Sequence, residues 1–139
     1  MDILDSNKFK IGVSSVLNRD VKQHGKQFMT DSEDDTAWSS NEGKPQWISI
    51  KFDEPQTISA FSFQFQGGFA GKDAKVRIET DDGRVLVDEP FYPEDINSVQ
   101  HFPLAIQVVD KEAIKVKFIF DQSTDFFGRI IVYKLQIFP

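Results

Sequence analysis

The strongest constraint on the fold is the alternation of apolar and polar residues in residues 57–66. Phe61, Phe63 and Phe65 are separated there by single polar residues, and a period of two places them on one face of a β-strand. Similar alternation recurs in residues 46–52, 113–120 and 129–137. Helical periodicity is almost absent, and turn-forming residues recur about every 8 to 12 positions. The sequence therefore predicts an all-β protein of roughly eight antiparallel strands, folded as a β-sandwich.

The 139 residues contain no obvious linker, so we expect a single domain with one hydrophobic core. Residues 1–12 are predicted to form a polar lead-in and the start of the first strand, which begins near Phe9. Residues 13–139 are predicted to form the sandwich. Within it, the Asp-Glu-Pro sequence of residues 53–55 is expected to end a strand, whereas residues 103–111 have no clear pattern.

Composition excludes several classes of protein. The chain has no cysteine, so disulfides and thiolate metal sites are ruled out. The N-terminus does not resemble a secretory signal, and no apolar run approaches the roughly 20 residues that span a bilayer, so we expect an intracellular protein. The net charge of −6, with both signs interspersed, disfavours direct binding to nucleic acid or to an anionic membrane.

Residues 31–52 combine an acidic turn with two tryptophans. The short acceptor side chains that follow Asp31 can hydrogen-bond their own backbone and favour a tight turn. We expect Trp38 to leave this turn facing inward and Trp47 to open the strand that follows. The two indoles are therefore predicted to be structural anchors of the sandwich.

Three blocks of residues carry a resemblance to a known family. Their order and spacing are similar to those of the discoidin, or coagulation-factor C-type, domain, which is a jelly-roll β-sandwich of the galactose-binding-like superfamily. The blocks are Ser14-Ser15, then Thr30-Asp31 with Asp35-Thr36 and Trp38, then Gln46-Trp47 with Phe52. Residues 14–19, 64–69, 91–95 and 124–129 further resemble a small intracellular branch of that family whose members associate with an orphan nuclear receptor.

The resemblance implies a binding domain without enzymatic activity. It implies a protein partner, a nuclear receptor, a role as a transcriptional co-repressor, and a location in the nucleus and cytoplasm. The superfamily also implies an alternative, which is the binding of carbohydrate. Catalysis has little support from the residues, because neither His24 nor His101 lies in a catalytic or metal-ligand spacing and the paired acids occur in turns.

Many members of the superfamily hold a structural calcium ion in the acidic turn. The resemblance assigns Asp31, Asp35 and Thr36 as its oxygen ligands. Two departures from the family pattern oppose this assignment, since Ser32 replaces a glycine and Lys134 replaces an acidic residue on the last strand. We therefore expect no cofactor, with Lys134 paired to Asp31 or Asp35, and keep bound calcium as the alternative.

Several loops carry aromatic or basic residues that a sandwich does not require. They define a candidate binding rim, whose residues are Asn18, Arg19, Phe69, Phe91, Tyr92, Phe126, Phe127 and Arg129. Loop aromatics either contact a partner or close the end of the core; we expect partner contact for Phe69 and Phe126 and core packing for Phe91 and Phe127. Arg129 either faces a ligand or braces Asp125.

The shape of the rim distinguishes the two functions. A concave polar pocket with one stacked aromatic ring would favour carbohydrate, whereas a convex apolar surface would favour a protein partner. Asn18 and Arg19 belong to this rim only if the topology of the family holds.

Overall fold

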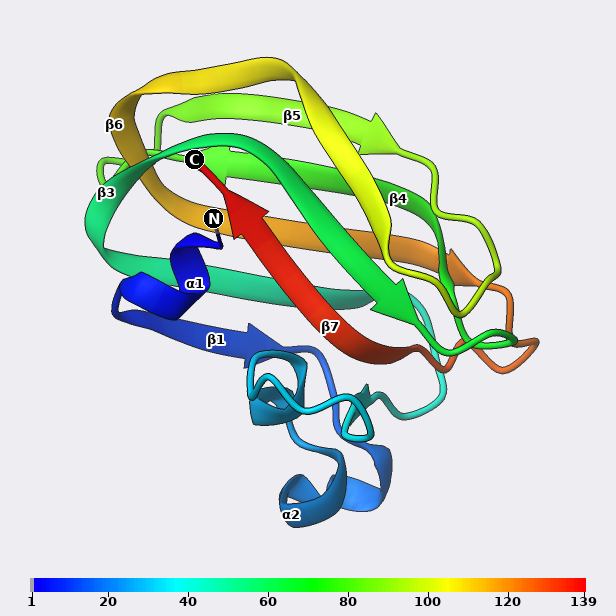
Figure 1. Ribbon diagram of the computed structural model, residues 1–139. Coiled ribbons are helices and arrows are strands. Elements are labelled where there is room, and N and C mark those ends of the chain that lie inside the picture. The colour runs from blue at the N-terminus through cyan, green and yellow to red at the C-terminus, as the bar shows by residue number, and fades with distance from the viewer. Residues whose placement is uncertain (1) are drawn as a thin grey trace.

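The computed structural model describes residues 2–139, and most of them lie in strands (Figure 1). The strands are β1 (Phe9–Val13), β2 (Trp38–Ser39), β3 (Gln46–Phe65), β4 (Gly71–Glu79), β5 (Val85–Phe91), β6 (Gln100–Ser123) and β7 (Ile131–Phe138). The short helices are α1 (Ile3–Ser6), η1 (Leu17–Arg19), α2 (Val21–His24) and η2 (Lys26–Met29). Within residues 2–139, no helix is long and apolar enough to cross a membrane.

Two long strands, β3 and β6, take part in both layers of the sandwich. The first part of β3 pairs with β1 and with the second part of β6, whereas its second part pairs with β7 and with the first part of β6. Both ribbons turn over at the left of Figure 1. One layer is therefore β1–β3–β6–β4–β5 and the other is β2–β7–β3–β6, with every pairing antiparallel. This arrangement confirms the predicted antiparallel β-sandwich.

The strand boundaries differ from the prediction at the bend of these two strands. Residues 53–55 do not end a strand, and residues 103–111 are part of β6. The pairing of β3 with β6 shifts register between Lys51 and Gln56, so Pro55 falls where its missing N–H breaks no ladder hydrogen bond. Seven strands result, because each of the two long strands joins segments that the sequence pattern separates.

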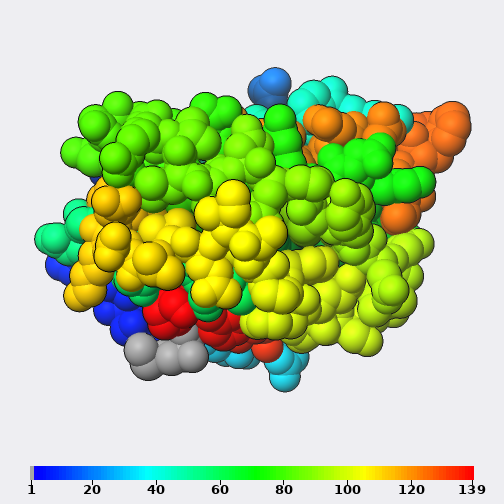
Figure 2. Space-filling view, turned by 90° about the horizontal axis from the view of Figure 1, so that it is seen from above, coloured from blue at the N-terminus to red at the C-terminus, as the bar shows by residue number. Residues whose placement is uncertain are grey.

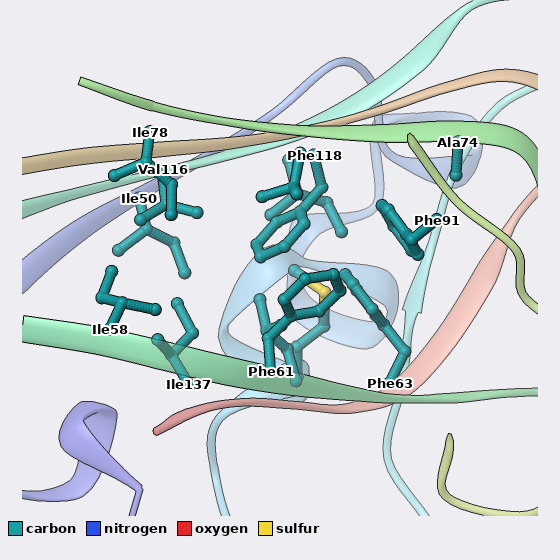
Figure 3. Close-up of a cluster of buried hydrophobic side chains, with 14 of the residues drawn as sticks. Ile50, Ile58, Phe61, Phe63, Ala74, Ile78, Phe91, Val116, Phe118 and Ile137 are labelled. Carbon is teal, nitrogen blue, oxygen red and sulfur yellow. The ribbon is translucent and has the colours of Figure 1, made fainter. Parts of the chain in front are cut away.

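The core lies between the two layers and is rich in phenylalanine. Phe61, Phe63, Phe91 and Phe118 meet there, mostly edge to face, with centroids 4.8 to 6.2 Å apart (Figure 3). Ser62 and Gln64, which alternate with these phenylalanines on β3, are polar, as the alternation predicts. Phe91 is 5% exposed, which confirms its predicted core position.

The two tryptophans have different environments. Trp38 is fully buried, and its Nε1 donates a 2.9 Å hydrogen bond to the carbonyl oxygen of Ser15, as expected of an anchor. Trp47 is only half-buried because it shares the outward face of β3 with Ser49, opposite the core residue Ile48. The Lys117 ammonium lies 4.8 Å from the centre of its ring. The prediction that both indoles anchor the core is therefore wrong for Trp47.

The N-terminal segment packs against the sandwich. In α1, Ile3 and Leu4 are buried in the core. The Asp2 carboxylate accepts hydrogen bonds from the backbone N–H groups of Leu4 and Ile137, each at 3.0 Å, and so joins the start of the chain to β7. Burial raises the pKa of Asp2 above its ordinary value of 3.8.

Candidate functional site

Loops from five segments meet at one end of the sandwich, and we call this end the rim. The rim comprises residues 17–19, 40–45, 66–70, 92–99 and 124–130. Backbone contacts tie the loops together: the N–H of Gly43 donates to the Phe127 carbonyl at 2.8 Å, and that of Thr124 donates to the Ala70 carbonyl at 3.0 Å. Figure 2 shows the segment after β6, in orange, projecting from this end beside the bright green segment after β3. The rim is thus one continuous surface.

The most prominent part of the rim is a tight turn that carries Phe126 and Phe127. The turn is closed by a 3.0 Å hydrogen bond from the N–H of Gly128 to the carbonyl oxygen of Asp125, so both phenylalanines occupy its tip. Phe126 is 87% exposed and Phe127 is 53% exposed, with their rings edge to face at 5.3 Å. The predicted core position of Phe127 is therefore wrong, because a two-residue tip directs both side chains away from the sandwich.

Glycine is required at the base of this turn. Gly128 has φ of +88°, and a Cβ at this position would lie 2.5 Å from the carbonyl oxygen of Gly43. The close approach of the two backbones joins the turn to residues 40–45. The phenylalanine pair is consequently held on two loops rather than on a free hairpin.

Arg129 braces the same turn from within. Its Nε and Nη2 donate to the two carboxylate oxygens of Asp125 at 3.0 and 3.3 Å, so the bracing alternative describes this residue. The hydrogen bond from Arg129 holds the pKa of Asp125 below its ordinary value of 3.8. The guanidinium also lies 5.3 Å from the ring centre of Phe69 and 5.7 Å from that of Phe127. Phe69 is half-buried under it.

Asn18 and Arg19 reach the rim through η1. Both are exposed and have left-handed backbone angles, with φ of 54° and 57°. The N–H of Asn18 donates to Oδ1 of Asn41 at 3.0 Å, which attaches η1 to residues 40–45. The family topology thus brings these two residues to the rim, as the resemblance implied.

Tyr92 lies at the start of a loop that contacts the segment after β3. This side chain is 79% exposed. The loop is held by the Asn97 and Asp95 side chains, which accept hydrogen bonds from the N–H groups of Gly67 and Gly68, each at 2.7 Å. Tyr92 also lines a cavity of about 240 Å³ between β5 and β6, whose deeper wall includes Phe61 and Phe102.

A polar network beneath the rim was not predicted from the sequence. Buried Gln46 donates through Nε2 to the carbonyl oxygens of Asn41 and Gly43, each at 3.0 Å. Its Oε1 accepts hydrogen bonds from the hydroxyls of Ser14 and Ser15. The presence of Ser14-Ser15 and Gln46 in the family-like blocks was the available signal. The network fixes residues 40–45, on which the phenylalanine turn rests.

In the acidic turn, the Asp31 carboxylate is engaged by hydrogen bonds within the turn. Thr36 Oγ1 donates to Oδ2 of Asp31 at 2.6 Å, and the N–H of Glu33 donates to Oδ1 of Asp31 at 3.0 Å. Lys134 Nζ lies 3.7 Å from Oδ1 of Asp34, so the predicted pairing of Lys134 with Asp31 or Asp35 is wrong. Asp31 is hydrogen-bonded within the turn, whereas Asp34 lies on the side of Lys134. In the described part of the chain, no three His, Asp or Glu side chains are grouped to hold a metal ion.

One contact between a serine and a histidine was also not predicted from the sequence. Ser62 Oγ and His101 Nδ1 lie 3.1 Å apart across β3 and β6. Ser62 is buried and the imidazole packs against the ring of Phe138, 5.4 Å away between centroids. Among residues 2–139, no carboxylate lies within ion-pair distance of His101 to orient it as a base. The pair is therefore a structural contact between strands.

The sequence has relatives among named proteins. It is 47% identical over 131 residues to the nuclear receptor 2C2-associated protein of Danio rerio, an alignment that covers 94% of this chain and 91% of the relative. It is 39% identical over 127 residues to the protein of the same name from Homo sapiens, covering 90% of this chain and 87% of the relative.

Solved structures share the fold at low sequence identity. A family 32 CBM from C. perfringens NanJ in complex with galactose has a TM-score of 0.71 and 15% identity, covering 93% of this chain and 92% of that one. An F5/8 type C domain from Bacteroides fragilis has a TM-score of 0.75 and 14% identity, covering 93% and 89%. These likenesses confirm the galactose-binding-like jelly roll.

A family model for the F5/8 type C domain matches residues 10–125. This range extends from β1 to the turn of the rim and includes both long strands. The chain therefore belongs to the F5/8 type C, or discoidin, domain family.

Proposed function

We propose that this chain is a non-enzymatic interaction module that binds a nuclear receptor through the rim and acts with it in the nucleus and cytoplasm as a transcriptional co-repressor. The single observation that carries the proposal is the exposed pair of Phe126 and Phe127 on a braced turn. Burying one phenylalanine in an interface contributes about 1.5 to 3 kcal/mol. An aromatic pair held at a rigid tip also loses little conformational entropy on binding, which is typical of an interaction hot spot.

The choice of partner rests on the relatives. They carry the name of nuclear receptor 2C2 and align with at least 90% of this chain. The co-repressor role and the compartments are inferred from that association. A folded surface, rather than a short helical peptide, would make the contact, because the exposed aromatics belong to loops of the sandwich.

Carbohydrate binding is the alternative function, and one observation bears on it. A sugar site needs a concave pocket, whereas Phe126 and Phe127 are exposed at the tip of their turn. The segment after β6 that contains this turn projects from the molecule in Figure 2. Of four cavities among the described residues, one includes the rim residue Tyr92, and none includes Phe69, Phe126, Phe127 or Arg129. The rim thus suits a protein surface better than a sugar ring.

The test compares two double variants by calorimetric titration against purified nuclear receptor 2C2. The rim variant is Phe126→Ala, Phe127→Ala, and the matched control is Ile106→Ala, Val109→Ala, which removes exposed apolar side chains of β6. We expect the rim variant to bind with a Kd at least about 30-fold higher, since hot-spot truncations cost about 2 kcal/mol or more of binding free energy. The control should change Kd by less than about threefold.

Two results would contradict the proposal. Equal affinity of the rim variant and the wild type would remove the rim from the interface. Binding of galactose or N-acetylgalactosamine by the wild type, lost in the rim variant, with no heat on titration of the receptor, would favour the carbohydrate alternative. The melting temperature of each variant is measured first, so that loss of binding is not confused with unfolding.

A further inference from the structure

A basic surface lies on the outer side of the layer β1–β3–β6–β4–β5, away from the rim loops. The pairing register places Lys10, Lys51 and Lys115 directly opposite one another on three neighbouring strands, β1, β3 and β6. These strands lie one above another in Figure 1. Directly opposed residues of antiparallel strands point to the same side of the sheet with Cβ atoms about 5 Å apart. The three ammonium groups therefore form a row.

A second row lies next to the first. Lys117 of β6 is opposite Arg77 of β4, and Lys75 follows on the same side of β4. The residues between them along the strands, including Val76 and Val116, are buried in the core, which fixes the outward direction of the basic side chains. We call the resulting surface the basic face. Its residues are Lys10, Lys51, Lys75, Arg77, Lys115 and Lys117.

The positive charge of the basic face is only partly compensated. Arg77 lies 3.6 Å from Glu79 and 3.6 Å from Asp88, the two carboxylates of β4 and β5 on this side. Within the part of the chain that the structure describes, none of the five lysines has a carboxylate within ion-pair distance. Like charges directly opposite one another destabilise a sheet, and three such pairs occur here. The chain as a whole carries −6, so this surface has the opposite sign to the molecule.

The basic face is small and bounded by acids. Neighbouring strands lie about 4.8 Å apart, so the face from β1 to β4 spans roughly 14 Å. The row of Lys10, Lys51 and Lys115 ends on β4 at Glu79, which is directly opposite Lys115. Asp53 follows Lys51 on the same side of β3, and Asp121 stands at the other end of β6. A nucleic-acid backbone or a membrane would extend over these carboxylates and be repelled. A short acidic segment of a polypeptide would fit between them.

We propose that the basic face binds a short Asp- and Glu-rich segment of a protein partner. The charges complement one another, and the bound carboxylates remove the repulsion between the opposed lysines. The core behind the sheet fixes the strands, so the Cα and Cβ atoms of the lysines are already in register before binding. This interaction is separate from that of the rim and does not depend on it.

The test uses fluorescence anisotropy with a fluorescein-labelled peptide of about eight residues that alternates Glu and Ser, at low ionic strength of about 20 mM. The face variant is Lys51→Glu, Lys117→Glu, which turns all three like-charged pairs into opposite ones. The control is Lys22→Glu, Lys26→Glu, which changes the net charge equally at exposed lysines of α2 and η2. We expect binding to weaken at least about tenfold in the face variant and less than about twofold in the control.

The melting temperatures of the same variants show whether each of them is folded. The face variant should melt within a few degrees of the wild type, because the removal of three repulsive pairs offsets the loss of the contact between Lys117 and Trp47. Equal weakening in both variants would overturn the proposal, since only net charge would then matter. No binding of the acidic peptide by the wild type would also overturn it. So would tighter, face-dependent binding of a single-stranded oligonucleotide or of phosphatidylserine vesicles, because the site would then belong to another class of ligand.

Discussion

The Arg129 guanidinium holds both carboxylate oxygens of Asp125, at 3.0 and 3.3 Å, and so closes the base of the turn that exposes Phe126 and Phe127. The two residues are four positions apart, and the turn between them also bonds through its backbone, from the N–H of Gly128 to the Asp125 carbonyl. The exposed aromatic pair and the contacts that hold it therefore belong to one short segment.

The Asp125–Arg129 pair should make stability depend on acid pH. Arg129 lowers the pKa of Asp125 below 3.8, so the folded state binds this proton less readily than the unfolded state. The stabilisation is fully present above about pH 4 and is lost as the pH falls through the depressed value. The melting temperature of the wild type should thus exceed that of Asp125→Asn at pH 6, and the gap should close toward pH 3. A gap that does not vary with pH would contradict the assignment.

Truncation of Phe91 should destabilise the fold strongly, whereas truncation of Phe126 should have little effect on stability. Phe91→Ala leaves a cavity among five aromatic rings and should cost about 3 to 5 kcal/mol in the free energy of unfolding. Phe126→Ala removes an exposed ring and should change it by less than about 0.5 kcal/mol. Urea denaturation monitored by circular dichroism measures both. A large loss of stability in Phe126→Ala would show that the turn packs inward.

Ser32 occupies a backbone conformation that suits glycine. Its φ is 62°, a conformation that costs an L-residue about 1 to 2 kcal/mol in the folded state. Glycine avoids this cost, but its greater freedom in the unfolded chain lowers the stability of the fold by about 0.5 to 1 kcal/mol. Ser32→Gly should therefore raise the free energy of unfolding by about 0.5 to 1 kcal/mol. Ser98→Gly, at a residue without positive φ, is the control and should lower it slightly. Destabilisation by Ser32→Gly in chemical denaturation would mean that the serine side chain supports the acidic turn.

Gln46 should be the most sensitive polar residue beneath the rim. Gln46→Leu removes the donor to the carbonyl oxygen of Gly43, whereas that of Asn41 keeps the Ser40 hydroxyl as a donor. An unsatisfied buried acceptor costs about 1 to 3 kcal/mol. Hydrogen exchange at the amide of Gly43, which bonds Phe127, should accelerate together with the loss of stability. Gln107→Leu, at an exposed position of β6, is the control and should leave both measurements nearly unchanged. Unchanged exchange in Gln46→Leu would separate the network from the rim.

Much of the fold followed from the alternation of apolar and polar residues. The inward phenylalanines of β3 and the buried Trp38 were predictable, because a period of two fixes which side chains face the core. Trp47 was misplaced, although its alternation with Ile48 and Ile50 already put it, like Ser49, on the outward face of β3. The bend of β3 at residues 53–55 was hidden because Asp, Glu and Pro usually end strands, and only the register shift shows why they do not.

The sequence indicated which residues belong to the rim but not the directions of their side chains. Phe126 and Arg129 stood out in the sequence, but the direction of Phe127 depended on the turn that Gly128 closes. The partner of Lys134 could not be foreseen, because neighbouring side chains of an irregular turn point in different directions. The basic face lies across four strands, so only the register between distant segments brings its residues together.

The passage of β3 and β6 through both layers has a consequence for unfolding. Because β3 and β6 belong to both layers, one layer cannot detach without breaking hydrogen bonds between strands of the other. Such a molecule has no independently opening half, and its protected amides should exchange through one global event. Because most pairings join segments distant in the chain, that event should also be slow to reverse, in the millisecond-to-second regime typical of sandwiches.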